Sequence, residues 1–294
     1  MVQYQNGESA NYLPTKNFKL TVNADDVIKS GTVTADKKDR IVPEMDWTFP
    51  GKYITKDFLA MMDILAHNNW KRPVYFASTV PSDNMLGLDR YLYSEGLTYR
   101  LMPFKPDTTA APQENSNTLL MYNNMVNKYK YGNFKTAKYL DHESLNLFYP
   151  LITRLYATLA DNLLKEGHID LAKNALKKYD DVMPSQIISS ELAVRKYYMV
   201  ESLYRMGDPT LANKLANQID DYLIDQLKYS YLLYQKSDAG LNTRDVQLFL
   251  SLLNGMEGLT KSYKQDALSA KIAAQLKDYS TKFGGLATQQ QPQQ

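Results

Sequence analysis

Cysteine is absent from the 294 residues of this chain, and histidine occurs only three times, as His67, His142 and His168. The lack of cysteine excludes disulfide bonds, thiolate nucleophiles and cysteine-based metal sites. No two of the histidines have a spacing that suits a shared metal ion. We therefore expect no metal site and no cofactor. The Asp-His-Glu triplet at residues 141–143 is interpreted as a charged turn or helix cap, with cation binding as the alternative.

The chain also lacks the sequence patterns of nucleophilic catalysis and of phosphate binding. It contains no Gly-x-Ser-x-Gly motif, no Gly-x-Gly-x-x-Gly loop and no Walker sequence. Its adjacent carboxylates, such as Asp25 and Asp26, are typical of helix caps and solvated helix faces. We expect no catalytic residues in this chain.

Neither charge of one sign nor a long hydrophobic run is present. The 34 basic and 32 acidic residues leave a net charge of +2, which gives no electrostatic reason to expect nucleic acid as a partner. No apolar run approaches the roughly 18–20 residues that a membrane-spanning helix needs. The first residues have neither a basic start nor an apolar core, so no signal peptide is predicted there. The chain by itself is expected to be soluble.

Proline and tryptophan divide the chain into two parts. Most of the 12 prolines and both tryptophans, Trp47 and Trp70, precede residue 113, and long proline-poor stretches follow. We expect an α+β protein that is mostly helical. The prediction is a small α/β domain over residues 1–112, tetratricopeptide-like antiparallel helical hairpins over residues 113–286, and a disordered Gln-rich tail over residues 287–294.

The first part reads as alternating helices and strands. Apolar and polar residues alternate over residues 18–22, which predicts a half-buried strand. A short helix follows, capped by Asn23 and stopped by Gly31. The remaining pattern predicts an extended segment at residues 40–47, a helix at 56–67, strands at 73–77 and 97–102, and a short helix at 85–94.

The second part reads as repeated helical hairpins. Two helices, over residues 155–164 and 171–179, are predicted to turn at Gly167 and to end before Pro184. Small side chains at the crossing allow the two helices to approach closely, as Ala160 and Ala172 would here. The turn glycine and the small residue recur at Gly207 with Ala212 and, more weakly, at Gly132 with Ala137, and a terminal helix is expected at 264–282.

A Trp-Lys-Arg sequence is the strongest candidate for ligand binding. Trp70 beside Lys71 and Arg72 can stack on a sugar or hold a peptide, and Asp83 and Asn84 in a nearby loop can bind hydroxyl groups. The alternative is structural. In that interpretation the tryptophan fills a helix-to-strand corner, the arginine pairs with a carboxylate, and the acidic or amide residue caps the next helix.

Several motifs together resemble one protein family. They are Asn-Asn-Trp-Lys-Arg-Pro-Val-Tyr-Phe-Ala at residues 68–77, Asp-Asn at 83–84 with Leu-Gly-Leu at 86–88, and Glu-Gly-Leu-Thr-Tyr-Arg-Leu at 95–101, with further matches at 12–16, 30–33, 131–133, 139–141 and 183–184. These motifs are similar to the C-terminal region of a group of Bacteroidetes multi-pass membrane proteins, long of unknown function. The resemblance covers residues from about 12 to about 235 and adds Arg100, within the third motif, to the candidate binding residues.

That family is similar to C-type glycosyltransferases, in particular to protein O-mannosyltransferase-like proteins that use a lipid-linked sugar. The resemblance implies a non-catalytic tail on the periplasmic side of the inner membrane. Its partners would be the membrane-embedded N-terminal region of the same protein and an acceptor polypeptide, and it would bind that acceptor or stabilise the membrane core. The alternative is a free-standing helical-repeat scaffold that binds peptides through residues such as Asn123, Asn124, Asn127, Lys128 and Tyr129.

Overall fold

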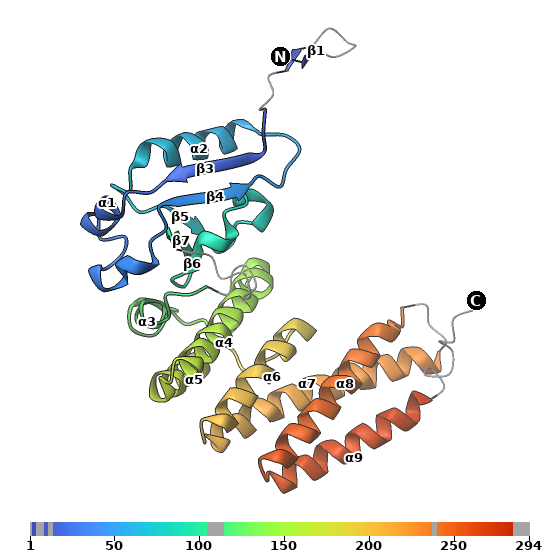
Figure 1. Cartoon of the computed structure of the whole chain (residues 1–294). Coiled ribbons are helices and arrows are strands. Elements are labelled where there is room, and N and C mark those ends of the chain that lie inside the picture. The colour runs from blue at the N-terminus through green and yellow to red at the C-terminus, as the bar shows by residue number, and fades with distance from the viewer. Residues whose placement is uncertain (1, 4–8, 11–13, 105–114, 237–239, 285–294) are drawn as a thin grey trace. The chain divides into compact units, whose positions relative to one another are not determined.

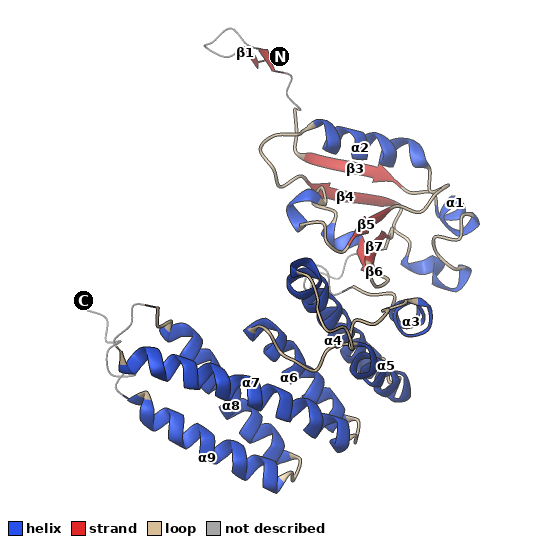
Figure 2. Cartoon of the chain, turned by 180° about the vertical axis from the view of Figure 1, so that it is seen from behind, coloured by secondary structure: helices blue, strands red, loops and turns tan. Residues whose placement is uncertain are grey.

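The chain forms two compact units, which are described separately here. The computed structural model describes residues 2–3, 9–10, 14–104, 115–236 and 240–284. Unit 1 comprises Met1–Met125 and unit 2 comprises Val126–Gln294. Unit 1 contains the strands and unit 2 contains the long helices (Figure 1, Figure 2). The predicted fold class, a small α/β part followed by antiparallel helical hairpins, is confirmed. The predicted boundary at residue 112 and the predicted tail lie outside the described residues.

A two-stranded antiparallel ribbon and a helix form one side of unit 1. Strand β3 (Asn17–Thr21) pairs with β4 (Glu44–Thr48), and α1 (Ala24–Lys29) follows β3 directly. As predicted, the Asn23 side chain caps α1 by accepting hydrogen bonds from the backbone N–H groups of Asp25 and Asp26. Helix α2 (Lys56–Asn68) runs beside the ribbon in both views (Figure 1, Figure 2).

A three-stranded antiparallel sheet forms the rest of the β structure of unit 1. Its order is β5 (Tyr75–Ala77), β7 (Thr98–Leu101) and β6 (Leu92–Ser94). Strands β5 and β7 lie within the strands predicted at residues 73–77 and 97–102. Two short segments, β1 (Val2–Gln3) and β2 (Ser9–Ala10), pair with each other, and 3₁₀ turns occur at Ala35–Arg40, Ser82–Asn84 and Asp89–Tyr91.

The predicted helix over residues 85–94 is wrong. Leu86 and Gly87 both have positive φ, 58° and 81°, which a right-handed helix excludes. The chain instead makes a tight turn, one 3₁₀ turn and strand β6. Met85, Leu86 and Leu88 are fully buried by this path. The apolar content that resembled a helix therefore belongs to a loop folded into the core of unit 1.

The long helices in the described part of unit 2 form three helical hairpins. Helix α4 (Tyr149–Lys165) packs against α5 (Ile169–Val182), α6 (Ser190–Arg205) against α7 (Pro209–Gln235), and α8 (Thr243–Ser262) against α9 (Asp266–Lys282). The first two hairpins turn at the predicted glycines, and the two helices of the first hairpin are longer than predicted. The predicted copy around Gly132 and Ala137 is not a helical hairpin. Only α3 (Thr118–Tyr122) and the π-helical segments Asn123–Lys128 and Ser144–Phe148 flank it within the described residues.

All three hairpins turn by the same backbone geometry. Gly167, Gly207 and Lys264 each have positive φ, 81°, 73° and 57° respectively. In each turn this residue donates its N–H to the carbonyl three residues before it, and the next residue donates to the carbonyl five residues before itself. This is the pattern that closes helices with a left-handed residue, where glycine is favoured. The third hairpin has the same turn with a lysine in place of glycine, so the glycine signal missed it.

Replacing Lys264 by glycine is expected to stabilise the protein. A side chain in the left-handed region costs about 1 kcal/mol or more, and glycine removes that cost. We expect the Lys264→Gly variant to raise the free energy of unfolding by about 1 kcal/mol, measured by urea unfolding followed through circular dichroism at the helix band. The reverse substitution Gly207→Ala, where an added Cβ meets no atom within 4 Å, should lower it by a similar amount. Destabilisation by Lys264→Gly would contradict this account of the turn.

Candidate functional site

The loop after α2 contains Trp70, the strongest binding candidate from the sequence, and has an unusual backbone there. Asn69 and Trp70 are consecutive non-glycine residues with positive φ, 46° and 58°. The Asn68 side chain holds this turn closed, because its Nδ2 donates to the Arg72 carbonyl at 2.7 Å and its Oδ1 accepts from the Arg72 N–H at 3.2 Å. Left-handed side-chain residues are strained and occur preferentially where function requires a particular geometry. The strain identifies this loop as a candidate site.

The turn places Trp70 at the base of a pocket. Only 7% of Trp70 is exposed, and it belongs to the buried core of unit 1. This burial agrees with the structural interpretation, in which the tryptophan fills a helix-to-strand corner, and the small accessible part of the residue forms an apolar floor of the pocket. The pocket has a volume of about 280 Å³. Its walls come from β3, α1, the end of α2 and the strands of the second sheet, and they are formed by Leu20, Thr21, Asn23, Asp26, Leu65, Asn68, Asn69, Trp70, Val74 and Leu101.

Several polar side chains of this pocket have free hydrogen-bonding capacity. The side chains of Thr21, Asp26 and Asn69 have no hydrogen bond or ion pair within the described residues. Asn23 uses only its Oδ1 atom to cap α1, which leaves its amide NH₂ group. A carboxylate, a hydroxyl and two amides around an aromatic floor match the alternating polar and apolar surface of a sugar ring. The sequence pattern gave Asn23 and Asp26 capping or surface roles and did not indicate that these four residues share a pocket.

The other predicted binding residues do not line this pocket. Lys71 and Arg72 are exposed, and Arg72 forms no ion pair within the described residues. Asp83 and Asn84 lie in the exposed 3₁₀ turn Ser82–Asn84 and cap no helix, since the helix predicted after them is absent. Of the six candidate residues, the structure brings only Trp70 to the pocket. The binding roles of the others stay predictions.

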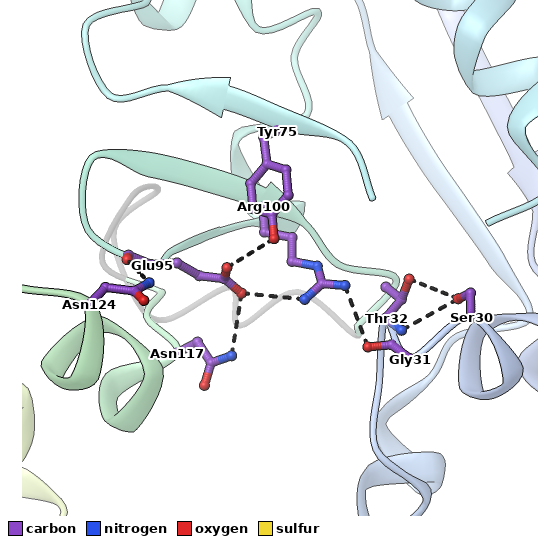
Figure 3. A network of polar contacts seen from close by, with 8 residues as sticks. All are labelled: Ser30, Gly31, Thr32, Tyr75, Glu95, Arg100, Asn117 and Asn124. Carbon is purple, nitrogen blue, oxygen red and sulfur yellow. Dashed lines mark hydrogen bonds and ion pairs between the residues drawn. The ribbon is translucent and has the colours of Figure 1, made fainter. Parts of the chain in front are cut away.

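Arg100, the sixth candidate, belongs to a network around a buried carboxylate (Figure 3). Glu95 is 4% exposed, and its Oε1 lies 3.7 Å from Arg100 Nη1. Tyr75 Oη donates to Glu95 Oε2 at 3.2 Å, and Asn117 Nδ2 donates to Oε1 at 3.4 Å. Arg100 Nη2 also donates to the carbonyl oxygen of Gly31 at 3.5 Å, and Asn124 Nδ2 donates to the Glu95 carbonyl at 2.9 Å.

This network is mainly structural. A buried carboxylate is tolerated when a cation and hydrogen-bond donors surround it, and Glu95 has both. Burial, together with the Glu95 charge, raises the pKa of the Tyr75 hydroxyl, so Tyr75 remains a proton donor to Glu95 at neutral pH. The network joins segments far apart in the sequence, because Gly31 follows α1 and Asn117 precedes α3. Asn124, predicted as part of a peptide-binding surface, is used here as an internal contact.

Two further observations concern metal ions and membranes. Within the described residues, no group of three or more His, Cys, Asp or Glu side chains could hold a metal ion. No helix in the described part of the chain is long and apolar enough to cross a membrane.

A protein-family model matches most of the unit that contains the pocket. Searches of curated proteins and of solved structures give no match. The family model of TMEM260-associated domain 2 matches residues 1–120, fewer than half of the 294 residues. Beyond residue 120, the resemblance read from motifs stays a prediction. The segment that carries the Trp70 pocket and the Glu95 network is therefore similar to TMEM260-associated domain 2.

Proposed function

We propose that this chain is the non-catalytic, periplasmic C-terminal region of a membrane-embedded glycosyltransferase that uses a lipid-linked sugar. The match of residues 1–120 to TMEM260-associated domain 2 supports this proposal. The motifs that resemble protein O-mannosyltransferase-like proteins support it as well. In this role the chain contributes binding, while the chemistry takes place in the membrane-embedded part of the same protein.

The Trp70 pocket carries the proposal, because its chemistry suits one sugar residue. A volume of about 280 Å³ is close to the lower limit of small-molecule sites, which are about 300 Å³ or larger. The indole supplies an apolar floor, and the Asp26 carboxylate, with the side chains of Thr21, Asn23 and Asn69, supplies acceptors and donors for hydroxyl groups. Hydrogen bonds to a charged group are worth about 1.5–3 kcal/mol, so Asp26 is expected to contribute most.

Sugar binding can be measured through Trp70 itself. The only other tryptophan, Trp47, is removed by the Trp47→Phe substitution, which leaves Trp70 as the reporter. Methyl α-mannoside is the probe, with methyl α-glucoside and methyl α-galactoside as stereochemical comparisons. We expect a saturable change in Trp70 emission at millimolar concentrations of at least one glycoside. In the same background, Asp26→Asn should weaken that binding by about tenfold, the equivalent of about 1.4 kcal/mol.

Asp25→Asn is the matched control for this experiment. Asp25 is adjacent to Asp26 on α1 and pairs with Lys38 on the surface, but it does not line the pocket. Its substitution should leave the affinity unchanged. Equal losses in the two variants would show that only the general negative charge of α1 matters. No emission change with any of the three glycosides would refute the sugar-binding proposal.

The second candidate function is a helical-repeat scaffold that binds polypeptide. Open grooves on unit 2, beside the loop between α5 and α6, favour it. The two functions are compatible, because the sugar pocket lies in unit 1 and the grooves lie in unit 2.

A further inference from the structure

The segment between α5 and α6 is fastened through its carbonyl groups. It runs from Pro184 to Ile188 without helical or strand structure. The Tyr149 hydroxyl lies 2.7 Å from the Pro184 carbonyl oxygen and 2.9 Å from that of Gln186, so it shares its proton between them. Lys196 Nζ donates to the Ser185 carbonyl at 3.1 Å. Three successive carbonyls are therefore satisfied by side chains of α4 and α6.

The backbone N–H groups of the same segment are not used in this way. The N–H groups of Gln186, Ile187 and Ile188 donate to no atom in the described part of the chain. Peptide N–H groups seek an acceptor, which is either water or another chain. Free N–H donors on a fixed, non-helical segment can bind the main-chain carbonyl groups of another extended chain, the kind of hydrogen bond by which peptides add to proteins.

Two grooves flank this segment and share part of their walls. The first has a volume of about 580 Å³ and the second about 440 Å³. Ser185, Gln186 and Ile188 line both. The first groove continues along α7, where its walls are Gln218, Asp221, Tyr222, Asp225 and Gln226, and the second continues to Phe134, Lys135, Ala137, Lys138, Tyr139, Leu140, Leu145 and Tyr149.

The two grooves carry opposite charges. Asp221 and Asp225 line the first, and among its described lining residues there is no basic side chain. Lys135 and Lys138 line the second, whose described lining holds no acidic side chain. The two aspartates are 76% and 73% exposed, and each has a lysine nearby, Lys271 at 3.9 Å and Lys228 at 3.2 Å. Exposed ion pairs of this kind are worth about 0–1 kcal/mol, so both aspartates remain available to a ligand.

We infer that unit 2 binds an extended polypeptide segment along residues 184–188. The main-chain carbonyls of the ligand accept hydrogen bonds from the free N–H groups of the loop. Acidic side chains of the ligand face Lys135 and Lys138, and its basic side chains face Asp221 and Asp225. Five residues of extended chain span about 16 Å, so the recognised segment is short. That this polypeptide is the sugar acceptor rests on the proposed function, whereas the groove itself does not.

The test uses a fluorescein-labelled peptide and reciprocal charge reversal. The probe has a pair of glutamates at one end, a pair of lysines at the other, and a spacer of serine, valine and threonine. Fluorescence anisotropy with the full chain should show saturable binding. Lys135→Glu combined with Lys138→Glu should weaken it by about tenfold or more, since opposite charges become like charges. Asp221→Lys combined with Asp225→Lys should do the same.

A second peptide, with lysine pairs at both ends, makes the test specific. It should bind the Lys135→Glu, Lys138→Glu variant more tightly than it binds the unchanged protein. Lys173→Glu combined with Lys177→Glu is the control, because these α5 lysines line neither groove and their reversal should leave both affinities unchanged. Bound peptide should also slow hydrogen exchange at the amides of residues 186–188. Circular dichroism verifies that each variant is folded.

The inference would be overturned by three results. They are the absence of saturable binding of either peptide, an equal loss of affinity in the control variant, and exchange protection that leaves residues 186–188 unaffected. Trp70→Phe separates this proposal from sugar binding, because that variant should keep peptide binding. Failure of the pocket and failure of the groove are thus distinguishable.

Discussion

Gly87→Ala is expected to destabilise unit 1 by about 3 kcal/mol or more, through strain and overlap that the fold cannot relieve locally. Gly87 has a φ of 81°. A Cβ atom added there would lie 2.4 Å from the Thr48 carbonyl oxygen and 3.2 Å from Pro50 Cδ. The first neighbour is backbone at the end of β4, so relief requires the loop to move away from the ribbon. That movement would expose Leu86 and Leu88, which are fully buried.

Gly31→Ala is the matched control for this prediction. Gly31 also has positive φ, 71°, but an added Cβ meets nothing within 4 Å. It should cost about 1 kcal/mol, the price of left-handed geometry alone. Urea unfolding followed by tryptophan emission measures both variants in unit 1, where both tryptophans lie. Equal losses in the two variants would show that the approach of Gly87 to Thr48 is not tight.

Lys196 is expected to make the stability of unit 2 rise with pH in the mildly alkaline range. Lys196 is 1% exposed, and burial lowers its pKa from 10.5 to about 8. Its nearest partners are neutral, namely the Ser185 carbonyl and Gln218 Oε1, with the rings of Tyr149 and Tyr179 about 6 Å away. The negative charge of Asp180 partly opposes the shift, and the positive charge of Lys214 adds to it.

The direction follows from which state binds the proton more tightly. A folded-state pKa below the unfolded value means that the unfolded chain stays protonated between pH 8 and pH 10.5, while folded Lys196 does not. The free energy of unfolding is therefore higher at high pH, and it decreases as the pH falls toward 8 and folded Lys196 takes up its proton. The free energy of unfolding should rise by about 2 kcal/mol from roughly pH 7.5 to 9.5. Above pH 10 it should fall, because burial raises the pKa of Tyr149 and Tyr179.

Two measurements check this prediction. The first is urea unfolding at several pH values for the unchanged protein and for Lys196→Met, in which the rise up to pH 9.5 should disappear. The second is carbon NMR of the lysine ε-methylene groups, in which one signal should titrate near pH 8 and be missing from the variant. The NMR titration needs no folded variant. The prediction of a lowered Lys196 pKa would be contradicted if the free energy of unfolding did not change with pH and no lysine signal titrated below pH 9.5.

The helical hairpins could be predicted from the sequence where a residue type indicates the backbone conformation of the turn. Gly167 and Gly207 mark left-handed turns because glycine has no Cβ, and both turns occur where expected. Lys264 makes the same turn with an ordinary side chain, so only the terminal helix was foreseen there and α8 was missed. At Leu86 a helix was predicted where there is none, since nothing about a leucine indicates a φ of 58°. A sequence pattern predicts the turns and helices that local backbone preferences determine. Tertiary packing determines the other backbone conformations, such as that of Leu86.

The candidate site shows the same limit at longer range. The motif around Trp70 directed attention to this loop, and its structural interpretation included a buried ring, but it did not predict which residues surround the pocket. Thr21, Asn23 and Asp26 reach the pocket only because β3 and α1 pack near the end of α2. Glu95 likewise meets Asn117 through tertiary folding. Such convergence depends on how the elements pack, and no spacing within a single segment encodes it.

The contacts of helix α7 bear on how far local unfolding at the C-terminal end of unit 2 spreads. Helix α7 has 27 residues and contacts α6, α8 and α9. Stacked repeats usually open one at a time, because each contacts only its neighbours and a loop separates them. Here α7 is about 40 Å long and contacts both helices of the third hairpin as well as α6, so opening of α8 and α9 also removes contacts that α7 makes. We therefore expect the second and third hairpins to open together more readily than hairpins that touch through short helices alone.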